Sequence, residues 1–317
     1  MADRDIDCIV CGTCTVDVLT RPVPLAEPPG AGRLFHVGPI EAVTGGLVCN
    51  AGVAMSKLGL RVAAAGLVGD DAWADVVRAG LAAEGIDASG METRHGAATS
   101  TTVVLVDPSG ERSFAHHVGA CAVLDAGFVE RHIDLFARSR WAMLGYFGLL
   151  PALETSLPGA LGVIRKVGCR TALDTAGDGG TLADLAPALP LLDLFVPSLA
   201  EASRQTGLSD PRSILDCYRA HGAAGIVGVK LGSQGVLLSA AAGERVEIPC
   251  IAAPGPVADT TGAGDAFLGG LVTGLVRGMG LREAGLLGAA TAACCVTGVG
   301  ATAGLRTLPE TLALLPR

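Results

Sequence analysis

From Trp141 onward, short apolar runs alternate with longer segments that have helical periodicity. The apolar runs predict strands at 141–144, 170–174, 194–197 and 225–231. The longer segments predict helices at 153–166, 181–188, 199–206 and 211–221. Strands that are separated by helices pair in parallel through right-handed crossovers. This half of the chain therefore predicts an α/β protein built on a parallel central sheet.

The first half of the chain gives a more varied pattern. It predicts strands at 7–12, 33–42 and 62–68 and helices at 50–58 and 72–84. Two alternating runs, 102–106 and 111–116, flank the turn Asp107-Pro108-Ser109-Gly110 and predict a β-hairpin. His116 and His117 end this hairpin on opposite faces, so at most one of them is expected to face a ligand.

Length and charge limit the possible classes of protein. The 317 residues suffice for one large α/β domain with a small appendage. The net charge is −8 and no block of Lys and Arg stands out, which argues against nucleic acid as a partner. No N-terminal basic segment precedes an apolar run, and no stretch reads as a membrane span. These features predict a cytoplasmic protein.

The chain has ten cysteines, and Cys8, Cys11 and Cys14 form two overlapping Cys-x-x-Cys pairs. They lie on an apolar strand pattern, in which successive side chains point to opposite faces. No second cluster of Cys and His accompanies them in the sequence. Buried reduced thiols are therefore favoured over a metal site.

The most informative stretch is Asp259-Thr260-Thr261-Gly262-Ala263-Gly264-Asp265-Ala266-Phe267. It follows an extended segment, 248–257, and precedes a helical run, 266–276, so its small residues lie at a helix N-terminus. Free N–H groups there attract an anion, and glycine lets a phosphate approach the backbone. The carboxylate of Asp265 would repel that anion. This cost makes sense if Asp265 accepts a proton from a hydroxyl group. An ordinary helix start, capped by Asp259 or Thr261, is the alternative.

Two further features resemble a ligand site. Gly45 and Gly46 precede the helix that contains Asn50, whose amide both donates to and accepts from hydroxyl groups. A glycine-rich turn in which Asn50 caps the helix is the alternative. Asp17 lies just past the end of the first predicted strand, where open α/β sheets bind their ligands.

Taken together, these stretches resemble the two signatures of the PfkB (ribokinase-like) carbohydrate kinases. The stretch 259–267 is similar to the C-terminal signature, D-T-x-G-A-G-D-x-F, and 45–59 is similar to the N-terminal one. The resemblance implies a single ribokinase-like kinase domain over 1–317, with α/β/α layers and a mostly parallel central sheet. It also implies a small β-sheet lid formed by about 14–43 and 97–118.

The resemblance implies a role for each matching position. The positions expected to bind the sugar are Asp17, Gly45, Gly46, Asn50 and Asp265. The expected catalytic residues are Asp265, as the base, with Gly262, Ala263 and Gly264. The positions expected to bind the nucleotide are Ser198, Lys230, Gly232, Gly235, Thr261, Gly262 and Gly264, and Glu201 is expected to act on Mg²⁺ through water. The family usually has Asn at position 198 and Thr at position 230. A K⁺ site, known in several relatives, would fall on Asp259, Thr261, Cys295 and Gly300.

The predicted function is ATP-dependent phosphorylation of a hydroxymethyl group on a small sugar, as in ribokinases and fructokinases, by a homodimer that packs lid to lid. A nucleoside kinase of the same family is the first alternative, although aromatic residues make up only 3% of the chain. A sugar-phosphate kinase needs extra cations, for which Arg33 and Arg112 are the candidates. A catalytically silent sugar- or nucleotide-binding protein is the alternative outside the enzymes. A dinucleotide dehydrogenase is disfavoured, because no G-x-G-x-x-G follows the first strand.

Overall fold

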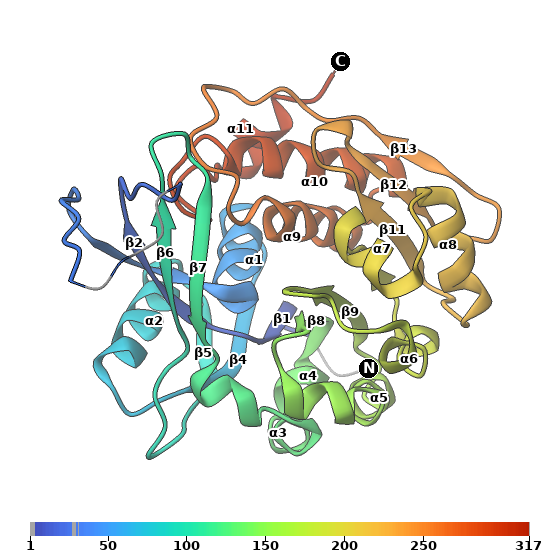
Figure 1. Ribbon diagram of the computed structural model, residues 1–317. Coiled ribbons are helices and arrows are strands. Elements are labelled where there is room, and N and C mark those ends of the chain that lie inside the picture. Colours follow the sequence, from blue (N-terminus) through green and yellow to red (C-terminus); the bar gives the residue numbers. More distant parts are fainter. Residues whose placement is uncertain (1–3, 27–29, 31, 317) are drawn as a thin grey trace.

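The computed structural model describes residues 4–26, 30 and 32–316 and contains two separate β-sheets (Figure 1). The strands of the large sheet are β1 (Ile6–Gly12), β4 (Val62–Val68), β5 (Asp87–Thr93), β8 (Ser139–Phe147), β9 (Arg170–Thr175), β10 (Leu194–Phe195), β11 (Ile226–Lys230), β12 (Val236–Ser239) and β13 (Val246–Ile248). Their order is β13-β12-β11-β10-β9-β8-β1-β4-β5. All neighbours from β5 to β11 pair in parallel, and β12 and β13 complete one edge in antiparallel pairing.

Helices cover both faces of this sheet. They are α1 (Gly46–Lys57), α2 (Ala72–Ala83), α3 (Ala126–Arg131), α4 (Ile133–Arg138), α5 (Pro151–Lys166), α6 (Leu182–Leu185), α7 (Leu199–Thr206), α8 (Pro211–Ala220), α9 (Ala263–Val276), α10 (Leu281–Cys295) and α11 (Leu308–Leu312). Figure 1 shows α1, α9 and α10 on one face and α3, α4 and α5 on the other. The result is the three-layer α/β/α arrangement with a mostly parallel sheet that the sequence predicts.

The centre of the sheet is buried on both faces. Every residue of β1 and β4 is buried, as expected for parallel strands that helices cover from both sides. The chain leaves β1 toward β4 on one side and returns to β8 on the other, so the strand order reverses beside β1. Such a reversal opens a crevice at the carboxyl ends of the strands, where open α/β sheets bind ligands.

The small sheet contains β2 (Thr15–Thr20), β3 (Glu41–Gly45), β6 (Thr101–Val106) and β7 (Arg112–His117), in the order β3-β2-β6-β7. The pairs β2–β3 and β6–β7 are antiparallel, and β2–β6 is parallel. The predicted hairpin is therefore present as β6 and β7. Residues 27–29 and 31, within the predicted lid stretch 14–43, lie outside the described residues.

Three local predictions are wrong. Residues 33–40 form no strand, because Pro39 lacks an N–H group and the neighbouring side chains are mostly exposed; the strand begins at Glu41. Helix α1 begins at Gly46, so Asn50 lies inside the helix and does not cap it. Helix α9 begins after Gly262, which has φ +74° and offers no side-chain cap, so neither Asp259 nor Thr261 caps it.

The clustered thiols lie in β1 and in the short connection that follows it, where Cys14 precedes β2. Cys8, Cys11 and Cys14 are all fully buried and free. Burial raises the pKa of Cys11 to about 12, so this thiol stays protonated and packs as a small apolar group. Among the helices that the structure describes, none has the length and apolar character needed to cross a membrane.

Helices α9 and α10 pack closely because glycines line their contact. A Cβ atom on Gly274 would lie 2.6 Å from the Cα atom and 2.7 Å from the Cβ atom of Ala284. A Cβ atom on Gly270 would lie 2.8 Å from the Cα atom of Gly288. This close approach sets the position of α9, whose N-terminus faces the carboxyl ends of the strands.

We expect Gly274→Ala to lower the free energy of unfolding by about 1–3 kcal/mol, because the added methyl group forces α9 away from α10. Gly162→Ala in α5 is the matched control. A Cβ atom there meets nothing within 4 Å, so this variant should be more stable by up to about 1 kcal/mol. Urea denaturation of both variants measures the difference, and a Gly274→Ala protein as stable as the wild type would contradict this packing.

Candidate active site

A cavity of about 650 Å³ lies at the carboxyl ends of β1, β8, β9 and β11, between the small sheet and the N-terminus of α9. Residues of β8, β9, β11, the small sheet and α9 line it, together with Thr13, which follows β1. They include most of the positions predicted from the sequence: Asp17, Gly46, Asn50, Ser198, Glu201, Lys230, Gly232, Thr261, Gly262, Ala263, Gly264 and Asp265. The fold thus brings together residues that lie far apart in the sequence.

The N-terminus of α9 has free N–H groups. No described residue accepts a hydrogen bond from the N–H groups of Gly262, Gly264 or Asp265. The first turn of a helix carries a partial positive charge, so these groups attract an anion in the cavity. Gly262 must be glycine here, because its φ is +74° and a Cβ atom would lie 2.4 Å from that of Ala301.

Asp265 in the same turn is only 5% exposed, and two side chains hold its carboxylate. Oδ2 accepts hydrogen bonds from Nδ2 of Asn50 at 2.8 Å and from the hydroxyl of Tyr146 at 2.7 Å. Burial raises the pKa of Asp265, whereas the two hydrogen bonds and the charge of Lys230 oppose that rise. Burial and the neighbouring charge of Asp265 also raise the pKa of Tyr146, so its phenol remains a donor.

Two buried polar atoms that line the cavity have no partner among the described residues. They are Oδ1 of Asn50 and Oγ1 of Thr175. Leaving a buried polar atom unpaired costs about 1–3 kcal/mol, so such atoms in a cavity indicate a missing polar ligand. Because Oδ1 of Asn50 is an acceptor beside Asp265, the ligand should carry a hydroxyl group at that point.

Asp17 lies in β2, and its carboxylate rests against the backbone of Gly45 in β3. A Cβ atom on Gly45 would lie 2.3 Å from Oδ2 of Asp17, so any other residue at this position would displace the carboxylate. Burial raises the pKa of Asp17 to about 6, helped by the charge of Asp265 and opposed by a hydrogen bond from Thr102. His116 Nδ1 lies 3.0 Å from Oγ1 of Thr102 and lines the cavity.

The next glycine, Gly46, turns the chain into α1. Its φ is +79°, and a Cβ atom would lie 2.5 Å from the carbonyl oxygen of Thr13. The N–H group of Val48 donates to this same oxygen at 3.1 Å. Gly46 therefore lets the start of α1 approach the end of β1, which places Asn50 in the cavity.

Lys230 ends β11 and forms a buried ion pair with Asp174 at the end of β9. Its Nζ lies 3.2 Å from Oδ1 of Asp174 and would lie 3.1 Å from a Cβ atom on Gly264. Burial alone would lower the pKa of Lys230, but Asp174, Glu201 and Asp265 outweigh it and raise the pKa. Burial raises the pKa of Asp174 to about 7, against the opposing charge of Lys230. The ammonium group therefore lies beside the free N–H groups of α9.

Ser198 and Glu201 form a capping box at the start of α7. Oε2 of Glu201 accepts hydrogen bonds from the N–H group and the hydroxyl of Ser198 at 2.8 and 2.6 Å. The hydroxyl of Ser198 is therefore used within the helix start, which explains how serine can stand where the family usually has Asn. Oε1 of Glu201 accepts no hydrogen bond from a described residue, and Glu201 lines the cavity.

A second, mostly apolar cavity of about 560 Å³ adjoins the first at Lys230, Gly232, Thr260 and Gly264. Val257, Phe267 and Val296 contribute its apolar walls. Gly235 also lines it and has φ +91°, and a Cβ atom there would lie 2.1 Å from the carbonyl oxygen of Ile248. Glycine is therefore required at position 235 because the chain there packs against the backbone of Ile248.

The four residues predicted to bind K⁺ do come together, but they bind one another. Oδ1 and Oδ2 of Asp259 accept hydrogen bonds from the N–H groups of Thr261 at 2.8 Å and Gly300 at 2.9 Å. The thiol of Cys295 donates to the carbonyl oxygen of Thr261 at 3.4 Å. Arg112 of β7 forms an ion pair with Asp259 at the same place. The guanidinium group of Arg112 already balances the one carboxylate of this cluster, so a further cation does not fit beside it.

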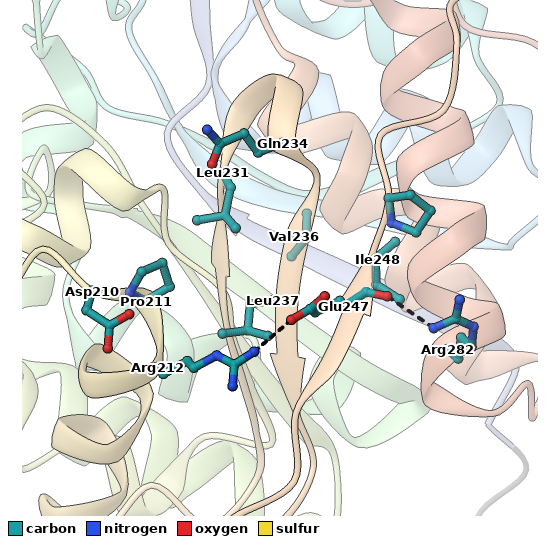
Figure 2. A pocket seen from close by; sticks show the side chains of 11 residues that line it. Asp210, Pro211, Arg212, Leu231, Gln234, Val236, Leu237, Glu247, Ile248 and Arg282 are labelled. Carbon is teal, nitrogen blue, oxygen red and sulfur yellow. Dashed lines mark hydrogen bonds and ion pairs between the residues drawn. The ribbon is translucent and has the colours of Figure 1, made fainter.

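A third hollow, about 630 Å³, lies at the antiparallel edge of the large sheet (Figure 2). Figure 2 shows Arg212 and Arg282 turned toward Glu247, which accepts from Arg212 at its side chain and from Arg282 at its backbone carbonyl. None of the residues predicted to bind sugar, nucleotide or metal lines this hollow. The candidate active site is therefore the pair of adjoining cavities at the carboxyl edge of the strands.

Two important residues of the site were not assigned roles from the sequence. Asp174 ends an apolar strand, and an acidic residue at such a strand end is a signal for a ligand site. Tyr146 lies in the stretch 145–147 at the end of β8, and nothing in the local pattern shows that it contacts Asp265. That contact depends on the packing of α9 against the sheet.

A buried carboxylate beside a helix N-terminus with free N–H groups suits the transfer of an anionic group to a hydroxyl, because the carboxylate can accept the proton of the hydroxyl while the N–H groups bind the anion. The family model described as "pfkB family carbohydrate kinase" matches residues 7–308. The chain therefore belongs to the pfkB family, which confirms the family and the ATP-dependent carbohydrate kinase activity predicted from the sequence.

Individual relatives agree with this assignment. The chain is 32% identical over 279 residues to the ribokinase of Haemophilus influenzae, covering 86% of this chain and 87% of that protein. It is 32% identical over 275 residues to the fructokinase of Klebsiella pneumoniae, covering 84% and 83%. The structure of Arabidopsis thaliana ribokinase complexed with ribose and ATP has the same fold, with a TM-score of 0.85, 22% identity, and 98% and 99% of the two chains covered.

We expect Tyr146→Phe to move the acid limb of the kcat–pH profile upward by about one pH unit. A hydrogen bond to a charged group is worth about 1.5–3 kcal/mol, and one pKa unit corresponds to about 1.4 kcal/mol. Loss of this bond raises the pKa of Asp265, and a base acts only when ionised, so activity is lost at a higher pH as pH falls. Initial rates at saturating substrate across pH 4–9 measure the shift.

The chain has only two tyrosines, and the second supplies the control. Tyr218→Phe removes a buried hydrogen bond to Oε1 of Gln205 that plays no part in the cavity. This variant should lose stability and keep the wild-type pH profile. An acid limb that is the same in Tyr146→Phe and the wild type would show that Tyr146 does not tune the carboxylate.

Proposed function

We propose that this kinase transfers the γ-phosphoryl group of ATP to a hydroxymethyl group of a small sugar. The observation that carries the proposal is the unpaired Oδ1 of Asn50, an acceptor held next to Asp265 at the free N-terminus of α9. A sugar hydroxyl bound there would lie between its base and the site for its phosphoryl donor. Such pre-positioning supplies much of the catalysis in phosphoryl transfer.

In this proposal each end of the larger cavity has its own task. Asp17, Asn50 and the backbone of Gly45 and Gly46 bind the hydroxyl groups of the sugar. Oδ1 of Asp265 faces the reacting hydroxyl, because Oδ2 is occupied by Asn50 and Tyr146. Asp265 takes the proton as the sugar oxygen attacks the γ-phosphorus atom, and ADP leaves with the electrons of the broken bond.

The phosphate chain would lie along α9 and Lys230. The free N–H groups of Gly262 and Gly264 and the ammonium group of Lys230 supply positive charge where the transition state gains negative charge, whereas the N–H group of Ala263 already donates to the carbonyl oxygen of Thr260 at 3.3 Å. Glu201, with one oxygen unpaired, is the residue that would hold Mg²⁺, which neutralises the phosphates when bound. The adenine ring would occupy the apolar cavity with Gly232 and Gly235.

The proposal is tested with Mg-ATP and a panel of acceptors: ribose, fructose, other pentoses and hexoses, sugar phosphates, and nucleosides. ADP release gives the rates, and phosphorus NMR of the product identifies the oxygen that is phosphorylated. We expect the highest kcat/KM for a free sugar that is phosphorylated on its hydroxymethyl group. A clear preference for nucleosides would replace this proposal with the nucleoside kinase, and no turnover of any acceptor would refute it.

Replacement of Asp265 by Asn tests the base directly. The side chain keeps its shape and loses only the proton acceptor, so ATP affinity should hold or improve while kcat falls by at least about 100-fold. Asp75→Asn, an exposed carboxylate in the first turn of α2, is the control and should keep the wild-type kcat. Retention of more than about a tenth of kcat, a loss under about 1.4 kcal/mol, would mean that Asp265 is not the base.

We also propose that the small sheet serves as a lid and that two chains associate through it. Ile40, next to β3, and Val103 of β6 expose apolar side chains, with 61% and 37% exposure, and a small sheet with open edges is marginally stable alone. We expect a homodimer in light scattering at micromolar concentration. Ile40→Glu should weaken it, and Leu208→Glu, on the loop between α7 and α8, should not. A wild-type monomer would refute the dimer.

A further inference from the structure

Arg112 joins the small sheet to the loop that leads into α9. It is the first residue of β7, directly after the hairpin turn. Nη1 donates to Oδ1 of Asp259 at 2.5 Å and to the hydroxyl of Thr261, and Nη2 donates to the hydroxyl of Thr260 at 2.8 Å. One guanidinium group thus binds three consecutive residues of this loop.

The ion pair with Asp259 is partly removed from water. The side chains of Arg112 and Asp259 are 17% and 11% exposed. Burial would raise the pKa of Asp259, but hydrogen bonds from Thr261 and Gly300 and the charge of Arg112 outweigh it and lower the pKa. The carboxylate is therefore ionised, and salt screens such a buried pair much less than it screens a surface pair.

Asp259 connects two loops at the entrance to the anion site. Its Oδ1 holds the N–H group of Thr261, and its Oδ2 holds the N–H group of Gly300, which follows α10. Thr261 is followed by Gly262, where the free N–H groups of α9 begin. The positive charge of Arg112, which balances Asp259, therefore helps to position these N–H groups.

This is also the place where the family resemblance implies a K⁺ ion. The oxygens of Asp259 are paired with N–H groups, and the carbonyl of Thr261 accepts from the thiol of Cys295. A guanidinium group already balances the single carboxylate of the cluster. A K⁺ ion beside it would be repelled by a like charge in a poorly screened environment.

We propose that Arg112 takes the place of a monovalent cation in this protein and positions the anion-binding loop from the small sheet. This inference rests on the proposed function. Arg112 belongs to the hairpin of β6 and β7, so its positive charge neutralises Asp259 when the hairpin lies over the site. Arg112 is a positioning residue: it holds Asp259, Thr260 and Thr261, and the backbone beyond them binds the phosphate.

The test compares the wild type with Arg112→Met, which keeps most of the side-chain bulk and removes the charge. Each protein is titrated with KCl to on the order of 100 mM, with tetramethylammonium chloride keeping the ionic strength constant, so that only specific cation binding changes the result. Three quantities are measured: the thermal unfolding midpoint, the dissociation constant for ATP, and kcat/KM. Arg21→Met is the control, since Arg21 also belongs to the lid region and pairs with Glu41 at the surface.

The wild type and Arg21→Met should respond to K⁺ by less than about twofold in kcat/KM and in ATP affinity. Without K⁺, Arg112→Met should lose about tenfold in kcat/KM, which corresponds to about 1.4 kcal/mol. K⁺ should restore at least about a third of that activity and raise the unfolding midpoint of this variant alone, by binding to the vacated carboxylate.

A wild type that is activated by K⁺ as strongly as Arg112→Met would overturn the proposal. So would an Arg112→Met protein whose midpoint and ATP affinity show no response to K⁺. The unfolding midpoint does not depend on turnover, so it still tests Arg112 if no acceptor of the panel is phosphorylated. Failure of every acceptor would refute the proposed function, and the response of the unfolding midpoint to K⁺ would still decide the role of Arg112.

Discussion

The carboxylate of Asp265 is the group around which the site is arranged, because it is ionisable and buried next to a site for anions. Burial favours its neutral form, which cannot accept a proton. Three neighbours favour the ionised form instead. Hydrogen bonds to Oδ2 come from Asn50 and Tyr146, and Lys230 contributes its positive charge. Each comes from a different part of the fold, so the ionised state of Asp265 depends on the correct packing of α1, β8, β11 and α9.

That packing depends in turn on small residues. Gly45 and Gly46 let β3 and the start of α1 approach the carboxylate of Asp17 and the carbonyl of Thr13. Gly270 and Gly274 let α9 approach α10 at distances that no larger residue permits. At these four positions glycine therefore serves close contacts between neighbouring parts of the fold.

The electrostatic balance of the cavity is unusual for a site that would receive a polyphosphate. Asp17, Asp174, Glu201 and Asp265 line it, against the single ammonium group of Lys230. Added phosphates would increase the excess of negative charge, so charge has to be supplied by helix N–H groups and by a divalent cation. Burial is the main reason why the pKa values of Asp17 and Asp174 lie above the ordinary range for a carboxyl group, and the charge of Asp265 adds to it.

The sequence by itself determined the class of fold and the family, and it pointed to many of the residues that line the larger cavity, because strand and helix periodicity and glycine spacing are local properties. It did not determine where α1 and α9 begin, since these starts depend on the left-handed backbone of Gly46 and Gly262. It also did not reveal that Tyr146 binds Asp265 or that Arg112 binds Asp259. Both contacts join segments more than 100 residues apart, 119 and 147 positions in the chain, and only the packing of the helices and the small sheet onto the central sheet brings them together.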